Sequence, residues 1–287
     1  MSVLATEPRT RISSIPPALV ELSADHPGFS DPIYRMRRNA IAYKALKFRE
    51  GEPVPNIEYN EGEHAVWRAV RERLLPLHEA VACRDYLECL ALVDLPLDRI
   101  PQLSEVNERL KKTSLFQMHP VGGLVAARDF LGRLSEHVFP STQYVRHRGQ
   151  PLFTPEPDVI HELIGHAAQL AHPKFSVINR EFGEASVYAD EATLERISRV
   201  YWFTVEMGVV HEDGKLKAYG AALTSSVDEM SKFHEKTLIP LDLEEVSETE
   251  FEVTSYQHKL FVASSFDSMI YGVSEWLRAV TANPTRY

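Results

Sequence analysis

Two histidines five residues apart, next to a carboxylate, are the residues of this chain best suited to chemistry. His161 and His166 flank Glu162 within the largely apolar segment 154-TPEPDVIHELIGHAAQLAHPKFS-176. Imidazole and carboxylate groups are common metal ligands in proteins. A zinc metalloprotease motif has its histidines four residues apart, but here Gly165 occupies that position. The pattern therefore predicts a metal site of another kind.

The five-residue spacing makes a demand on the local helix. On an ideal helix, residues five apart point about 140° away from each other, against about 40° for residues four apart. Both imidazoles reach one point only where the helix is distorted or widened, and Gly165 makes distortion cheap. Two histidines and one carboxylate give the facial ligand set of non-haem iron(II). The missing carboxylate must come from elsewhere in the chain.

Glu206 is the best candidate for that carboxylate. It lies in 199-RVYWFTVEMGVV-210, among aromatic and aliphatic side chains. An unpaired carboxylate is expensive in such a setting, and a cation removes that cost. A salt bridge to a lysine or arginine is the alternative explanation. The presence of the histidine pair in the same chain favours the metal.

Three longer motifs carry a resemblance to a known family. TPEPD-x-x-HEL-x-GH, YWFTVE-x-G and KAYGA-x-L-x-SS resemble the pterin-dependent aromatic amino acid hydroxylases, and the likeness extends over most of 25–287. It includes 25-DHPGFSDPIYRMRR-38, 120-PVGGLVAARDFLG-132 and 142-TQYVRH-147. The resemblance implies a phenylalanine hydroxylase-like catalytic domain. Such an enzyme uses Fe(II), O2 and tetrahydrobiopterin or a related tetrahydropterin to hydroxylate a free aromatic amino acid.

The resemblance also gives roles to residues around the metal. His161, His166 and Glu206 would hold the iron, and Glu162 would face the pterin. Phe130 matches the ring that stacks on the pterin. The other positions expected to contact the pterin are Gly123, Leu124, Val125 and Ala127. Family members have a serine near this last position, so one polar pterin contact is expected to be missing.

The same likeness assigns the substrate site. Arg146 matches the arginine that holds the substrate carboxylate, because a guanidinium fork can donate two parallel hydrogen bonds. Thr154 and Ser225 are expected to assist it, and Arg38 and Glu156 match a structural pair that supports the substrate loop. The remaining positions expected at the substrate are Phe139, Pro157, Trp202, Met207, Ala222 and Thr224.

Five positions bear on substrate and product. Val253 stands where tyrosine hydroxylases carry an acid, and Trp202 where tryptophan hydroxylases usually have the smaller Phe, so both favour L-phenylalanine. Met207 replaces a usual Phe, Ala222 a usual Gly and Thr224 a usual Leu. A pocket floor altered in this way allows oxidation at the meta carbon. We expect tyrosine as the product, with meta-tyrosine as the alternative, and tyrosine or tryptophan as alternative substrates.

Two rival functions remain open at this point. A zinc-dependent hydrolase would use Glu162 as a general base and would need neither pterin nor dioxygen. A non-catalytic metal-binding relative is the other, and the intact ligand set and Arg146 speak against it.

The elements that must position these residues are mainly helical. Apolar periodicity and capping residues predict helices over 32–49, 61–93 with a break at Pro76, 104–113 and 126–139. Strand patterns cover 143–147, 216–220 and 251–257. We expect a mainly α fold, a single helical catalytic domain over 25–287 with a few short β-hairpins, after a poorly ordered lead-in over 1–24.

Composition narrows the setting in which the protein works. The 287 residues carry a net charge of −10, which opposes binding to nucleic acid or anionic membranes. No apolar run is long enough to cross a bilayer, and Cys83 and Cys89 are expected as two reduced core thiols. We therefore expect a cytoplasmic protein. The family's regulatory domain and tetramerisation arm have no counterpart here, which implies a monomer.

Overall fold

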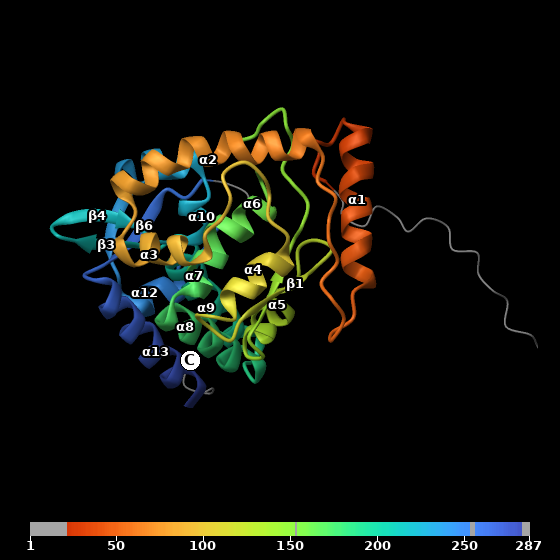
Figure 1. The fold of residues 1–287 in the computed structure, drawn as a ribbon. Helices are drawn as coiled ribbons and strands as arrows, with labels where there is room; N and C mark the ends of the chain where they lie inside the picture. The colour runs from red at the N-terminus through yellow and green to blue at the C-terminus, as the bar shows by residue number, and fades with distance from the viewer. Residues whose placement is uncertain (1–21, 153, 253–255, 283–287) are drawn as a thin grey trace, which may run out of the picture.

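The computed structural model describes residues 22–152, 154–252 and 256–282, and helices make up most of them, as expected (Figure 1). The α-helices are α1 (Pro32–Lys47), α2 (Glu61–Val81), α3 (Arg84–Val93), α4 (Leu103–Leu110), α5 (Ala127–Leu134), α6 (Val159–His161), α7 (Ala168–Ala171), α8 (Pro173–Val187), α9 (Glu191–Tyr201), α10 (Ala221–Thr224), α11 (Val227–Lys232), α12 (Leu243–Glu248) and α13 (Phe266–Ala282). The strands are β1 (Gln117–Pro120), β2 (Val138–Ser141), β3 (Val209–Glu212), β4 (Lys215–Ala218), β5 (Thr237–Pro240) and β6 (Lys259–Ala263). Two π-helical segments, η1 (Glu162–Ala167) and η2 (Trp202–Glu206), continue α6 and α9, and η3 (Phe233–Glu235) is a 3-10 turn.

The continuous helix α6–η1–α7 lies at the centre of the molecule, with other elements arranged around it (Figure 1). Every residue from Asp158 to Ala171 is buried. Such a helix is apolar on all sides because it is surrounded by protein. The polar side chains that it does carry, His161, Glu162 and His166 among them, therefore need partners inside the protein.

Side-chain caps fix where several helices begin. Asp31 accepts hydrogen bonds from the backbone of Ile33 and Tyr34, which confirms the start of α1 expected near this residue. Asn60 and Glu63 form a reciprocal capping box at the start of α2. Capping residues in the sequence were therefore good guides to helix starts.

The expected break at Pro76 is wrong, because α2 continues through this residue to Val81. A proline removes one helical hydrogen bond, but α2 is held by Trp67, Val70 and Leu74, whose side chains are fully buried. The break comes instead after Val81, where the Cys83 backbone N–H donates to the carbonyl of Ala218 at 2.9 Å. The chain thus leaves the helix to pair with β4.

The expected helix over 126–139 is too long. α5 ends at Leu134, and His137 adopts a left-handed φ of 58° that no α-helix contains. Residues Val138–Ser141 then form β2, which pairs in parallel with β1. An isolated proline near the end of an apolar segment did not distinguish a helix end from a strand.

The strands are short, as expected, but only one of their pairings is a hairpin within the described chain. β3 and β4 are antiparallel, while β3 with β6, β6 with β5, and β1 with β2 are parallel. The expected strand over 216–220 corresponds to β4. The segment 143–147 is in no strand, because two of its backbone groups bond to the start of α6: the Tyr144 carbonyl to the Val159 N–H and the Arg146 N–H to the side chain of the capping Asp158. The candidate over 251–257 falls partly outside the described residues.

Two further expectations concern the chain as a whole. Cys83 and Cys89 are both buried and form no disulfide, which confirms the two core thiols. Over the described ranges, none of the helices combines the length and the apolar character needed to cross a bilayer.

His78 connects α2 with the segment that carries several predicted substrate residues. Its Nε2 lies 2.6 Å from the carbonyl oxygen of Thr224, and since a carbonyl only accepts, this nitrogen carries the hydrogen. Burial lowers the pKa of His78 to about 4, because the charged ring would lose its hydration. The neutral ring is therefore the form that fits the fold.

We expect this buried histidine to make the protein less stable in mild acid. The unfolded His78 takes up a proton near its usual pKa and the folded one does not, so stability is full above about 6.5 and falls toward pH 4. The loss reaches about 3 kcal/mol. Urea unfolding of wild type and of His78→Gln, which keeps an N–H donor without a titrating ring, should show a smaller pH slope in the variant. Equal slopes would refute this role.

Candidate active site

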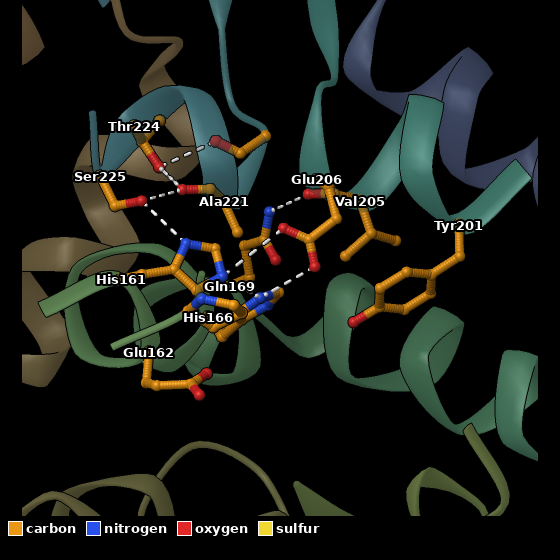
Figure 2. A network of polar contacts seen from close by, with 12 residues as sticks. His161, Glu162, His166, Gln169, Tyr201, Val205, Glu206, Ala221, Thr224 and Ser225 are labelled. Atoms are coloured by element: carbon orange, nitrogen blue, oxygen red, sulfur yellow. Dashed lines mark hydrogen bonds and ion pairs between the residues drawn. The ribbon is translucent and has the colours of Figure 1, made fainter. Parts of the chain in front are cut away.

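The helix that carries the two histidines is widened where the sequence required it. Residues Glu162–Ala167 form the π-helical segment η1, in which each turn takes up more residues than in an α-helix. His161 and His166 consequently point to the same place, with their Nε2 atoms 3.0 Å apart (Figure 2). The expected distortion is confirmed.

Glu206 reaches the same place from a second widened helix. η2 ends at this residue, and the Met207 N–H closes a five-residue turn onto the Trp202 carbonyl at 2.9 Å. The Glu206 carboxylate is 3.0 Å from Nε2 of His166 and 3.7 Å from Nε2 of His161. Figure 2 shows the acid pointing at both rings. The three predicted ligands therefore meet.

The three side chains fit a divalent metal. Two ligand atoms at about 2.1 Å from a metal and at right angles to each other lie about 3 Å apart, close to the separations seen here. Oε2 of Glu206 is buried and accepts no hydrogen bond from the described residues. A buried carboxylate oxygen without a donor is costly, and a cation would satisfy it. Two imidazoles and one carboxylate are also the donor set that suits iron(II).

Glu162 is a second carboxylate close to the two histidines, within 4.8 Å of their ring nitrogens. Its Oε1 accepts hydrogen bonds from both the backbone N–H and the hydroxyl of Thr142, each at 3.0 Å. Burial raises the pKa of Glu162 to about 7, since the carboxylate loses hydration. Glu206, whose Oε2 is unbonded, is therefore the better third ligand, and Glu162 is its neighbour.

The surroundings of the metal position hold two of the three predicted ligands, His161 and Glu206, in the form that binds a cation. Burial, together with the nearby His166, lowers the pKa of His161 to about 4. Burial opposes ionisation of Glu206, but His166 outweighs it and lowers the pKa of the carboxyl group below its usual value. Metal ligands must give up their protons to bind. His161 and Glu206 are thus already held in the deprotonated form.

Ser225 fixes which nitrogen of His161 faces the metal position. The serine hydroxyl donates its single hydrogen to the carbonyl oxygen of Ala221 at 2.7 Å. Its oxygen can therefore only accept from Nδ1 of His161, 2.9 Å away, so Nδ1 carries the ring hydrogen (Figure 2). The lone pair on Nε2 is left pointing at the metal position. This is the usual way in which a neighbour orients a ligating histidine.

Close packing at Gly165 brings Ser225 into place. A Cβ on Gly165 would lie 2.7 Å from the carbonyl oxygen of Ala221 and 2.8 Å from its Cβ, so only glycine fits. α10 therefore lies directly on η1. Gly165 thus permits both the widening of the helix and the close contact with α10.

A cavity opens beside His161 and Glu206. Its wall is mainly apolar, with a few charged groups, as small-molecule sites usually are. It is lined by Arg146, Leu152, Thr154, Pro155, Glu156, Pro157, His161, Trp202, Glu206, Met207, Ala222, Ser225, Ser226, Glu229, Tyr256 and Gln257. Most residues predicted to contact the substrate are in this set. Trp202 is held by stacking on Phe251, with ring centroids 4.9 Å apart.

Arg146 is buried at the cavity wall and bound to Asp158. Its Nε and Nη2 donate to the two oxygens of that carboxylate at 3.0 and 2.8 Å. Asp158 also caps the helix that carries His161, accepting the backbone N–H of that histidine at 3.1 Å. Two of the three guanidinium nitrogens expected to be available for a substrate carboxylate are thus already bonded to Asp158. Nη1, which makes no hydrogen bond within the described chain, is left for a substrate group.

The loop before α6 is held by an ion pair, as the resemblance suggested. Glu156 lies 2.5 Å from Arg38, which is almost fully buried, and 3.3 Å from His26. The Arg38 guanidinium also lies over the ring of Tyr144, 4.0 Å from its centroid. Thr154 donates its hydroxyl hydrogen to the Glu156 carbonyl at 2.7 Å. α1 therefore supports one wall of the cavity.

Two residues predicted to contact the substrate lie outside the cavity. Phe139 is fully buried behind His166, with ring centroids 4.5 Å apart. Thr224 is also fully buried, and its hydroxyl donates to the carbonyl of Gly220 at 2.9 Å. One supports a ligand ring and the other closes α10. Sequence position alone did not distinguish lining residues from those just behind them. Val253 falls outside the described residues.

The residues predicted to bind the pterin lie away from this cavity. Phe130 contacts Phe139 edge to face at 5.4 Å, and Phe139 in turn packs on His166. Phe130 therefore lies on the side of the metal position formed by His166 and Glu162. The cavity lies on the other side, formed by His161 and Glu206. The other predicted pterin residues lie in the loop before α5 and at its start, and they are Gly123, Leu124, Val125 and Ala127.

A second group of possible metal ligands has a simpler explanation. Cys83, Asp85 and Glu212 lie close together at the start of α3. Cys83 accepts from the Tyr86 N–H, and Glu212 accepts from the Arg84 N–H at 2.9 Å. Negative and acceptor groups are expected at a helix N-terminus. Cys83 and Glu212 therefore cap α3, and Asp85 lies in its first turn and pairs with His172.

Comparison with known proteins now decides the family. A family model described as biopterin-dependent aromatic amino acid hydroxylase matches residues 11–284, starting upstream of the expected boundary at Asp25. The chain belongs to this family. The resemblance drawn from the three sequence motifs is confirmed.

Individual relatives point to more than one substrate. Phenylalanine-4-hydroxylase of Bos taurus is 41% identical over 253 residues, which cover 86% of this chain and 56% of that protein. Tyrosine 3-monooxygenase of Mus musculus is 42% identical over 252 residues, covering 86% and 51%. The chain thus spans about half the length of these relatives.

Solved structures of two bacterial enzymes share the fold. Phenylalanine hydroxylase of Chromobacterium violaceum, with bound iron(III) and 7,8-dihydrobiopterin, matches with a TM-score of 0.76 at 28% identity, covering 86% of this chain and 92% of that one. The apo enzyme of Colwellia psychrerythraea matches with a TM-score of 0.74 at 28% identity, covering 80% and 90%.

Sequence reasoning missed several residues of the site. Asp158 was not singled out, although an aspartate three residues before His161 is a recognisable helix cap. Ser225 was expected at the substrate, and its bond to His161 was not foreseen. Glu229 and Gln257 also line the cavity, and neither was predicted to lie at the site. Only the fold brings these last two residues to the site.

We expect Gly165→Ala to damage the metal site. The added methyl group forces α10 away from η1 and displaces Ser225, so affinity for Fe(II) or Co(II) should fall about tenfold or more. The unfolding free energy should fall by about 1–3 kcal/mol. Metal titration and urea unfolding measure the two effects. Gly132→Ala is the matched control, since a Cβ there meets nothing within 4 Å. Unchanged metal affinity in the Gly165 variant would contradict the argument.

Proposed function

We propose that this protein is an Fe(II)- and tetrahydropterin-dependent monooxygenase that hydroxylates the ring of free L-phenylalanine to give tyrosine. The observation that supports it best is the convergence of His161, His166 and Glu206 at the wall of a cavity that also contains Arg146. A metal position and an anchor for an amino acid are thus combined in one pocket. Membership of the biopterin-dependent family supports the same activity.

The cavity residues would bind and orient the substrate. Nη1 of Arg146 would take the carboxylate, while Pro157, Trp202 and Met207 would enclose the ring beside the metal position. The side chains of Arg146 and Met207 are buried, so the site keeps bulk water away from the reacting ring. Position then decides which carbon reacts.

The metal and the pterin would supply the oxidising chemistry. Iron(II) together with tetrahydropterin provides the electrons that activate O2 for transfer of one oxygen atom to an aromatic ring. His161, His166 and Glu206 would hold the metal, and Ser225 keeps the correct nitrogen of His161 toward it. Phe130 and Glu162 would face the pterin. The protein itself contributes binding, orientation and a dry pocket.

The choice of phenylalanine and of the ring carbon rests on a few pocket residues. Trp202, Met207 and Ala222 line the cavity, whereas Thr224 lies behind it. Met207 and Ala222 are thus the departures from the family pattern that would touch the ring. We propose para-hydroxylation as the main reaction, with the ratio of para to meta product set by these two positions.

The zinc hydrolase alternative finds less support. Its general base, Glu162, accepts two hydrogen bonds from Thr142 and is not among the described residues that line the cavity. A base must reach the water that it activates. The geometry therefore favours the monooxygenase.

The proposed activity predicts a specific set of requirements. With Fe(II), tetrahydropterin and O2, L-phenylalanine should support faster oxygen uptake than L-tyrosine or L-tryptophan, and His166→Ala should abolish uptake because a ligand is lost. Oxygen electrode traces and chromatography of the products measure this. Turnover that survives removal of pterin and O2, or apo-protein reactivated by Zn²⁺, would instead support the hydrolase.

Restoring the usual family residues should change the product ratio. Met207→Phe combined with Ala222→Gly should raise the ratio of para- to meta-tyrosine above that of wild type, because both positions line the cavity. Thr224→Val, at a buried position outside the cavity, should leave the ratio unchanged. Chromatographic separation of the isomers decides the question, and equal ratios in wild type and double variant would refute the prediction.

A further inference from the structure

One acidic side chain in the cavity has no part in the function described so far. Three of the described cavity residues are acids, namely Glu156, Glu206 and Glu229. Glu156 is bound to Arg38 through both oxygens, at 2.5 and 2.8 Å. Glu206 faces the two histidines at the metal position. Glu229 is left as the acid whose purpose in the cavity is unexplained.

Glu229 is held in place from several sides. It lies in the first turn of α11, where its backbone N–H donates to the hydroxyl of Ser226, and it is only 8% exposed. Its Oε2 is 2.6 Å from Nζ of Lys236. The same Nζ donates to the carbonyl of Gln257 at 2.5 Å, another residue of the cavity wall. The carboxylate is therefore fixed rather than free to turn into solvent.

One oxygen of this carboxylate remains available. The contact with Lys236 is made by Oε2, Oε1 of Glu229 accepts no hydrogen bond from the residues that the structure describes, and this atom is not completely buried. A carboxylate oxygen can accept two hydrogen bonds. Lys236 already balances the negative charge of the Glu229 carboxylate. Oε1 would therefore attract a cation mainly by accepting a hydrogen bond from it.

A free amino acid in this cavity brings two charges. Arg146 offers Nη1 to the substrate carboxylate, but the α-ammonium group also loses its hydration on entering a largely apolar pocket. An ammonium has three N–H donors and no acceptor. It therefore needs an oxygen acceptor that is fixed, partly buried and not already used.

We propose that Glu229 accepts a hydrogen bond from the substrate's α-ammonium group and so makes the enzyme select free amino acids. The proposal rests on the function proposed above. Arg146 then binds the carboxylate and Glu229 the ammonium group of the amino acid, while the ring lies beside the metal position. A compound with the same ring and carboxylate but no ammonium gains nothing from Glu229.

The test compares L-phenylalanine with 3-phenylpropionate, which lacks only the ammonium group. In the iron-loaded enzyme with tetrahydropterin, Glu229→Gln should raise KM for L-phenylalanine about ten- to hundredfold, the usual range for one charge-assisted hydrogen bond. The KM for 3-phenylpropionate should stay within about twofold. Substrate-dependent pterin oxidation measures both. Glu235→Gln, which removes an exposed carboxylate outside the cavity wall, should change neither.

Each outcome has a clear meaning. Equal effects of Glu229→Gln on the two compounds would assign Glu229 a purely structural role and overturn the proposal. If that variant does not fold, Glu229→Asp keeps the charge but withdraws it from the cavity, and the same selective loss for L-phenylalanine is expected. Wild-type protein that oxidises pterin with neither compound would refute the proposed function instead. Wild-type activity that is equal for both compounds would refute the role of Glu229 alone.

Discussion

The structure depends on a single geometric constraint, namely that two histidines five residues apart must point to one place. An α-helix cannot achieve this, so α6 passes into the π-helical segment η1. The helix that supplies Glu206 is widened in the same way at η2. A π-turn is rare and occurs mostly as a single turn within an α-helix, so it needs surroundings that hold it. The buried position of η1 among the other helices provides that support.

The surrounding elements can be understood as the means of holding these two distorted turns. Gly165 lets α10 lie directly on η1, and Gln169 donates to the carbonyls of Val205 and Tyr219, which ties α7 to the end of η2. Burial and neighbouring charges then keep His161 and Glu206 ready for a cation. Packing and electrostatics therefore act on the same site.

The sequence predicted the metal position better than it predicted the fold around it. Spacing and residue type identified His161, His166 and Glu206, because a ligand set is a local chemical requirement. Helix caps such as Asp31 could also be identified directly from the sequence. The path of α2 through Pro76 and the parallel pairing of β1 with β2 depend on long-range packing, which periodicity does not contain. Glu229 could not be found at all, since only folding brings α11 to the cavity.

Asp158 has one more consequence. The same carboxylate caps the helix of His161 and binds Arg146, so the proposed metal position and the proposed anchor for the amino acid head group are held by one side chain. These shared hydrogen bonds set the distance between the two. Under the proposed function, an amino acid with one methylene more or fewer between its backbone and its ring would therefore place the wrong atom beside the metal position.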